Sequence, residues 1–231
     1  MTLRAKLLSI TLAMGAVALL FVGLRAADAW RTQTSLAEAR AINAIADKYL
    51  AAAAAWAVER GTGNTIIGNP AAATAEQRAT IQRQRQAGDA AFAEAGRLLA
   101  AMPAALREEH GRVEAALREL APLRQRLDAL AAPDAELARA WFPSVSGVIV
   151  RSMDVRMKVE RELDAETPPA VRTMFEVKGL LAVMAEFAGR ERGGVAGIVA
   201  GGRPLTGPQN QVQGENRGNI VNAWGRLRIL S

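Results

Sequence analysis

The chain has 231 residues, a formal net charge of +6 and a hydrophobic fraction of 50%, but only 4% of its residues are aromatic. It has no cysteine and one histidine, which excludes disulfides, thiolate metal sites and a metal site built from histidines. The composition is rich in alanine, leucine, arginine and glutamate, and it therefore predicts an all-α protein.

The N-terminal residues 1–29 are predicted to be a transmembrane anchor. Arg4 and Lys6 precede an uncharged and mostly apolar run, Leu7–Leu24, which is long enough for a short transmembrane helix. Basic residues beside a transmembrane helix stay on its cytoplasmic side, so the rest of the chain is expected in the periplasm. This single anchor is expected to hold it at the inner membrane.

A cleaved signal peptide is the alternative interpretation of the same residues. Ala27-Asp28-Ala29 matches the small-residue pattern of a cleavage site. Arg25 separates the apolar run from that pattern, and Trp30 suits a membrane interface, so an uncleaved anchor is favoured.

A long helix is expected from about Thr34 to Ile67, where Asn69-Pro70 stops it. Steps of three, four and seven place one set of its residues on a single face. These residues are Ile42, Ile45, Tyr49, Ala53, Trp56, Arg60 and Ile67. Thr74 and Gln77 then resemble a capping box, which starts a second helix that ends near Met102.

Two more helices follow, from Ala104 to Leu130 and from Asp134 to about Asp164, and Pro122 is expected to kink the first of them. His110 lies in a charged run and is expected to be a solvated surface residue. Four helices with short connections predict an up-down-up-down four-helix bundle over residues 30–167.

Two Glu-Arg-Gly triplets indicate an internal repeat. Glu59-Arg60-Gly61 and Glu191-Arg192-Gly193 are 132 residues apart, and the same shift aligns Ile66-Ile67 with Ile198-Val199. After a break at Thr167-Pro168-Pro169, residues 171–200 repeat the first long helix, and a turn leads to a last helix over residues 209–230. Residues 168–231 are thus predicted to be the first half of a second bundle, in a fragment of a longer protein.

Both triplet arginines are predicted to point into the bundle. Arg192 shares its helical stripe with Leu181, Ala185, Ala188 and Val199. A buried guanidinium keeps its charge and needs an anionic partner, and the adjacent Glu59 and Glu191 diverge around the helix. Two partners remain open, a carboxylate on another helix or an anion from outside.

Glycines cluster just after both arginines. They are Gly61, Gly63, Gly68, Gly193, Gly194, Gly197 and Gly201. Each costs about 1 kcal/mol in a helix interior, so they indicate close approach of a neighbouring helix or a small ligand. Arg190 is expected to point to a different side from Arg192, toward a subunit interface, and its planar fork of donors suits a planar oxyanion.

Nothing in the sequence favours an enzyme, because cysteine is absent and the single histidine has no catalytic context. Gly201–Thr206 lacks the Gly-Lys-Ser/Thr ending of a phosphate loop and is expected to be a helix C-cap with a turn.

Met184–Gly193, followed by Gly202-Arg203-Pro204-Leu205-Thr206, resembles the extracytoplasmic region of bacterial chemoreceptors with nitrate- and nitrite-sensing-type domains, and Trp56–Gly61 is similar to the matching part of the first helix. The resemblance implies two four-helix bundles that bind nitrate or nitrite through arginines on long helices. It implies ligand-binding roles for Arg60, Arg192 and Arg190, although Val58 stands in the first copy where Arg190 stands in the second.

We therefore expect a homodimeric, membrane-anchored periplasmic sensor of a chemoreceptor-like receptor, which binds a small anion without a cofactor and signals across the membrane. The alternative is an exported helical scaffold or interaction module whose arginines form internal salt bridges. Nucleic-acid binding is the weakest hypothesis, because the positive charge is interleaved with acidic residues and forms no basic block; we expect no nucleic-acid partner.

Overall fold

The computed structural model describes residues 3–163 and 165–230, and the side chains of residues 5–11 and 13 lie outside that description. All regular structure in the described residues is helical, as the composition predicts. The elements are α1 (Leu3–Gly68), η1 (Pro70–Ala72), α2 (Ala75–Leu98), η2 (Leu99–Ala101), α3 (Ala104–Asp128), α4 (Ala135–Glu160), α5 (Pro169–Ala200) and α6 (Gly207–Leu230).

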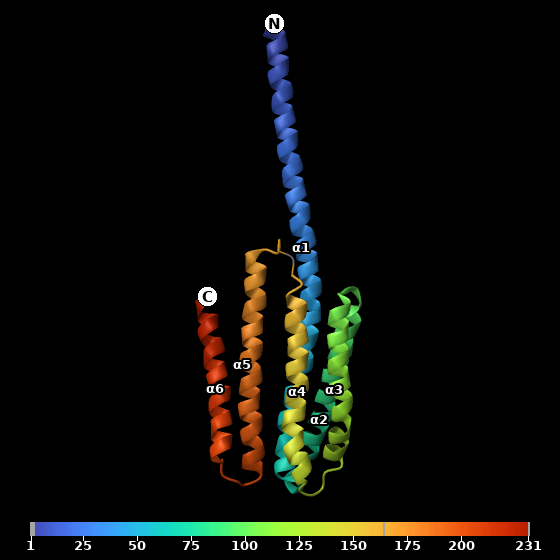
Figure 1. The fold of residues 1–231 in the computed structure, drawn as a ribbon, viewed down its shortest axis with the longest axis vertical. Coiled ribbons are helices and arrows are strands. Elements are labelled where there is room, and N and C mark those ends of the chain that lie inside the picture. The colour runs from blue at the N-terminus through green and yellow to red at the C-terminus, as the bar shows by residue number, and fades with distance from the viewer. Residues whose placement is uncertain (1–2, 164, 231) are drawn as a thin grey trace.

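Helix α1 is longer than the periodicity predicts. It is continuous from Leu3, whereas the amphipathic pattern starts only near Thr34. No proline or glycine stands between Arg25 and Thr34, so no residue there breaks the helix before its apolar stripe begins. The N-terminal part of α1 projects well beyond the other helices (Figure 1).

Helices α1–α4 run alternately down and up and pack around one hydrophobic core (Figure 1). The predicted stripe of α1 is confirmed, because each of its residues is at most 8% exposed. Trp141 of α4 is fully buried and donates from Nε1 to the carbonyl oxygen of Arg60 at 3.0 Å. The first triplet therefore packs directly against α4.

The helix ends also agree with the sequence. The Thr74 hydroxyl accepts from the backbone N–H of Gln77 at 3.1 Å, and the Gln77 side chain accepts from the Thr74 N–H at 2.9 Å. This is the predicted capping box, and each contact satisfies a donor that the first helical turn leaves unpaired. Asp134 caps α4 in a similar way, and α3 continues through Pro122.

The prediction for His110 was wrong. Its ring is half-buried, stacks on Phe92 with a centroid distance of 4.0 Å, and shares a 2.8 Å hydrogen bond between Nδ1 and the hydroxyl of Tyr49. Burial lowers the pKa of His110. The charged neighbours in the sequence lie on the outer face of α3, whereas the imidazole lies on the inner face.

Helices α5 and α6 repeat α1 and α2 with an offset of 132 residues. Helix α1 ends at Gly68 and α5 at Ala200, and the bounds Ala75–Leu98 of α2 correspond to Gly207–Leu230 of α6. The predicted boundary at residues 167–168 lies in the connection between α4 and α5.

Two polar contacts of the first copy recur in the second at that offset. One is the capping box of the second helix, and the other is an ion pair from that helix to the glutamate of the triplet. The pairs are Thr74–Gln77 and Arg85–Glu59 in the first copy, and Thr206–Gln209 and Arg217–Glu191 in the second. The repeat thus extends beyond the triplets to the helix starts and to specific side-chain contacts.

No helix within the described residues has an apolar stretch long enough to cross a membrane. The predicted anchor, Leu7–Leu24, includes the side chains of residues 7–11 and 13, which lie outside the described part of the chain. The described apolar side chains of that run are exposed, among them Leu19 and Phe21, and so is Trp30.

Candidate functional site

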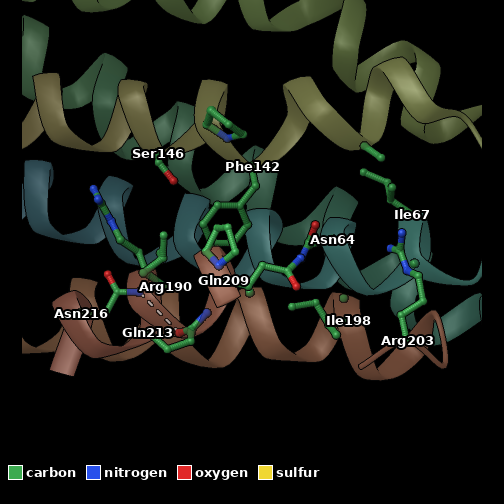
Figure 2. A pocket seen from close by; sticks show the side chains of 17 residues that line it. Asn64, Ile67, Phe142, Ser146, Arg190, Ile198, Arg203, Gln209, Gln213 and Asn216 are labelled. Atoms are coloured by element: carbon green, nitrogen blue, oxygen red, sulfur yellow. Dashed lines mark hydrogen bonds between the residues drawn. The ribbon is translucent and has the colours of Figure 1, made fainter. Parts of the chain in front are cut away.

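A cavity of about 510 Å³ lies between α1 and α4 on one side and α5 and α6 on the other (Figure 2). Its polar lining consists of Asn64, Ser146, Arg190, Arg203, Gln209, Gln213 and Asn216. Figure 2 shows the side chains of Arg190 and Arg203 at opposite ends, with Asn64 and Phe142 between them. Since both copies of the repeat contribute walls, neither copy forms this cavity alone.

Glycines bring α1 and α5 into backbone contact beside the cavity. A Cβ on Gly193 would lie 3.2 Å from the Cα of Gly61, and a Cβ on Gly68 would lie 2.3 Å from the carbonyl oxygen of Gly197. Asn64 bridges the same contact, because its Nδ2 donates to the carbonyl oxygen of Gly193 at 2.8 Å. The glycine clusters therefore serve close approach of a neighbouring helix, one of the two roles predicted for them.

Arg60 is fully buried, as its helical position predicts. Its Nη1 donates to Glu186 Oε1 at 2.7 Å and to the Ser146 hydroxyl at 3.0 Å, and its Nη2 donates to Glu186 Oε2 at 3.2 Å. Its Cζ lies 4.9 Å from the ring centroid of Phe142. The partner of this guanidinium is thus a carboxylate from another helix, although Arg60 Nε has no hydrogen-bond partner among the described residues.

Glu186 of α5 is shared between two arginines. Its Oε1 also accepts from Nε of Arg190 at 2.7 Å, and the Arg190 guanidinium lies over the ring of Phe187, with its Cζ 5.1 Å from the centroid. Arg190 lines the cavity formed within this one chain, on a side of α5 different from that of Arg192. Arg60 lies behind the cavity wall and contacts it through Ser146 and Phe142.

The prediction that Arg192 points into the bundle was wrong, because its side chain is exposed. The other members of its stripe, Leu181, Ala185, Ala188 and Val199, are exposed as well. The face of α5 that packs against α1 instead contains Gly193 and Gly197, both buried. Helical periodicity identified residues that share a face, but on this helix the inward face is the one made of small residues.

Several lining residues were not predicted, among them Asn64, Arg203 and three amides of α6. The signal for Arg203 was the Gly-Arg-Pro-Leu-Thr turn, in which Gly202 has a φ of +60°, a conformation that favours glycine. This turn brings the Arg203 guanidinium against Gly201, where a Cβ would lie 3.0 Å from Nε. The α6 amides gave no such signal, because polar residues on a helix normally indicate a face that is exposed to solvent.

Glu59 belongs to a separate buried network in the first bundle. It is fully buried and accepts from Arg85 Nε at 2.9 Å and from Arg124 Nη2 at 2.7 Å. Arg124 also donates to Asp89, which accepts from Nε1 of Trp56 at 2.9 Å. The two charged residues of the first triplet therefore diverge, as predicted, and Glu59 stabilises the bundle.

The cavity lining is rich in hydrogen-bond donors. Arg190 and Arg203 line it, and the described lining residues include no acidic side chain. Glu186, which pairs with Arg190 and with the buried Arg60, is not among them. Amide and guanidinium N–H groups beside Phe142 can bind a planar oxyanion by charge-assisted hydrogen bonds in a partly desolvated space.

Comparison with known proteins agrees with this chemistry. The sequence profile of the nitrate and nitrite sensing family matches residues 51–226, which include both triplets and all of the cavity lining. No curated protein matches the chain. No solved structure matches it either. Because the match spans most of its length, the chain belongs to the nitrate and nitrite sensing family.

Proposed function

We propose that this protein is the periplasmic sensor region of a bacterial transmembrane receptor, and that it binds nitrate or nitrite in the cavity between α1, α4, α5 and α6. The observation that carries the proposal is Arg190, which lines the cavity and shares Glu186 with the buried Arg60. Membership of the nitrate and nitrite sensing family supports the choice of anion.

In this proposal the anion competes with Glu186 for the guanidinium of Arg190. A nitrate ion in the cavity takes hydrogen bonds from Arg190 and the neighbouring amides, while Glu186 keeps its paired contact with Arg60. Since the cavity walls belong to both copies of the repeat, binding favours one packing of α5 against α1 over another.

The signal leaves the site along α1. This helix is continuous from the cavity wall to Leu3, so a shift of α1 against α5 moves its N-terminal part as well. We propose that Leu7–Leu24 anchors this part in the inner membrane, because Arg4 precedes the run and its described apolar side chains are exposed. The exposed apolar face of α5 with Leu181 and Val199 supports a homodimer.

A helical scaffold without a small ligand is the second candidate. It is favoured by one observation, the paired hydrogen bonds between Arg60 and Glu186, which already neutralise that arginine within the chain. In this case the cavity is a packing defect between the two copies of the repeat, and anions stabilise the fold only through general ionic strength.

Calorimetric titration of the protein with nitrate, nitrite, chloride and sulfate at constant ionic strength separates the two candidates. The sensor predicts saturable heat with nitrate or nitrite and none with chloride or sulfate. Titration heats that are the same for all four anions, without saturation by nitrate or nitrite, would support the scaffold.

A further inference from the structure

A second cavity, of about 580 Å³, lies toward the other end of α5, between α4, α5 and the last turns of α6. Its charged lining consists of Arg156, Arg161, Arg172 and Arg226 together with Glu160 and Glu176. Both glutamates form an ion pair within this lining, Glu160 with Arg156 and Glu176 with Arg226. Apolar side chains, including Met153, Phe175 and Leu180, form the rest of its wall.

Arg156 is the residue whose hydrogen bonding is incomplete. It is only 2% exposed, and its Nη2 donates to Glu160 Oε2 at 3.1 Å. Its Nε and Nη1 are buried and have no hydrogen-bond partner among the described residues. A buried guanidinium stays charged, and each unmade hydrogen bond of a charged group is costly, so these donors indicate a missing acceptor.

A glycine makes room for this guanidinium. A Cβ on Gly179 of α5 would lie 3.1 Å from Arg156 Nη2. The same arrangement occurs at Arg60, where a Cβ on Gly189 would lie 3.5 Å from Nη2. Arg156 and Arg60 thus each lie against a glycine of α5, but Arg60 has a bidentate carboxylate partner and Arg156 has a single hydrogen bond to Glu160.

We propose that this second cavity binds an organic monocarboxylate with an apolar body. The carboxylate oxygens accept from Nη1 and from the second N–H of Nη2 of Arg156, the end-on pairing that Arg60 makes with Glu186. The apolar body packs against Met153, Phe175 and Leu180. Nitrate has no apolar body to pack against these side chains, so we expect this cavity to take a different anion from the first.

Burial acts on the charges of this cavity in the expected direction. It lowers the pKa of Arg156 and raises that of Glu160, because water solvates neither charge well. The Arg156–Glu160 pair is thus poorly solvated, while two donors of Arg156 have no acceptor among the described residues.

The test is calorimetric titration of the full chain with benzoate and with hexanoate, in the presence and absence of saturating nitrate. We expect one saturable site for at least one of the two probes, with an affinity that nitrate does not change. Arg156→Gln should weaken binding at least tenfold, whereas Arg151→Gln, an exposed arginine of the same helix, should leave it unchanged.

Gly179→Ala provides an independent variant in case Arg156→Gln unfolds. Its methyl group intrudes on the Arg156 guanidinium, so binding should weaken several-fold, and Gly218→Ala is the control because nothing lies within 4 Å of that position. Failure of both probes to bind the wild-type protein would overturn the proposal. Unchanged affinity in either folded variant, Arg156→Gln or Gly179→Ala, would overturn it too.

Discussion

Gly61 of α1 and Gly193 of α5 face each other, and a Cβ on Gly193 would lie 3.2 Å from the Cα of Gly61. These two glycines occupy the same position in the two copies of the repeat, 132 residues apart. The copies therefore meet at equivalent residues, with α1 and α5 running in the same direction (Figure 1). The cavity with Arg190 and Arg203 lies beside this contact.

Gly68→Ala should destabilise the protein. A Cβ there would lie 2.3 Å from the carbonyl oxygen of Gly197, and because that oxygen is backbone the helices must move apart, at a cost of about 1–3 kcal/mol. Gly214→Ala, in open space on α6, should instead stabilise by up to about 1 kcal/mol through helix propensity. Urea denaturation of both variants measures the difference, and equal stabilities would show that α1 and α5 do not need this close approach.

Glu59→Gln and Glu191→Gln should differ sharply although they change equivalent residues of the repeat. Glu59 is fully buried between Arg85 and Arg124, so its loss leaves buried positive charge and costs about 3–5 kcal/mol. Glu191 pairs with Arg217, whose side chain is 74% exposed, and its loss should cost about 1 kcal/mol or less. Chemical denaturation compares them, and similar losses would contradict the burial assigned to Glu59.

Glu186→Gln should make the stability of the protein depend more strongly on the nitrate concentration. The substitution removes the carboxylate shared by Arg60 and Arg190 and should cost roughly 3 kcal/mol without added anion. If nitrate competes with Glu186, its affinity should rise roughly tenfold in the variant, and thermal unfolding should show a larger nitrate-dependent rise in Tm. A variant whose Tm responds to nitrate no more than the wild type would argue against that competition.

His110 should make stability fall in mildly acidic solution. Its folded-state pKa lies below its ordinary value of 6.5 because of burial, so the unfolded chain binds the proton more tightly. The stability that neutral His110 contributes to the folded state is therefore fully present above pH 6.5. It is lost as the pH falls from 6.5 to the folded-state pKa. In His110→Gln this part of the pH dependence should disappear, as measured by Tm between pH 7.5 and 5.

Much of the fold could be predicted from the sequence because its signals are local. The stripe from Ile42 to Ile67, the Thr74–Gln77 box and the proline breaks each depend on residues within a few turns. The repeat was also visible, since two triplets and a pair of apolar residues share one offset. Burial of Arg60 followed from its place on the stripe of Trp56.

The site was predicted less completely because its geometry is set by contacts between four helices. Arg192 and Arg190 are two residues apart, and the choice between them depends on which face of α5 meets α1. That face consists of glycines, which a search for apolar residues passes over. Asn216 and Gln213 become lining residues only because α6 packs beside α5.

The most direct test of the central claim compares Arg190→Ala with Arg192→Ala in calorimetric nitrate titrations. Both substitutions remove one arginine from the same helix, but Arg190 lines the cavity and Arg192 is exposed. We predict that Arg190→Ala weakens nitrate binding at least tenfold, while Arg192→Ala binds as the wild type does. Loss of binding in Arg192→Ala alone, or wild-type binding in Arg190→Ala, would contradict the placement of the nitrate site in this cavity.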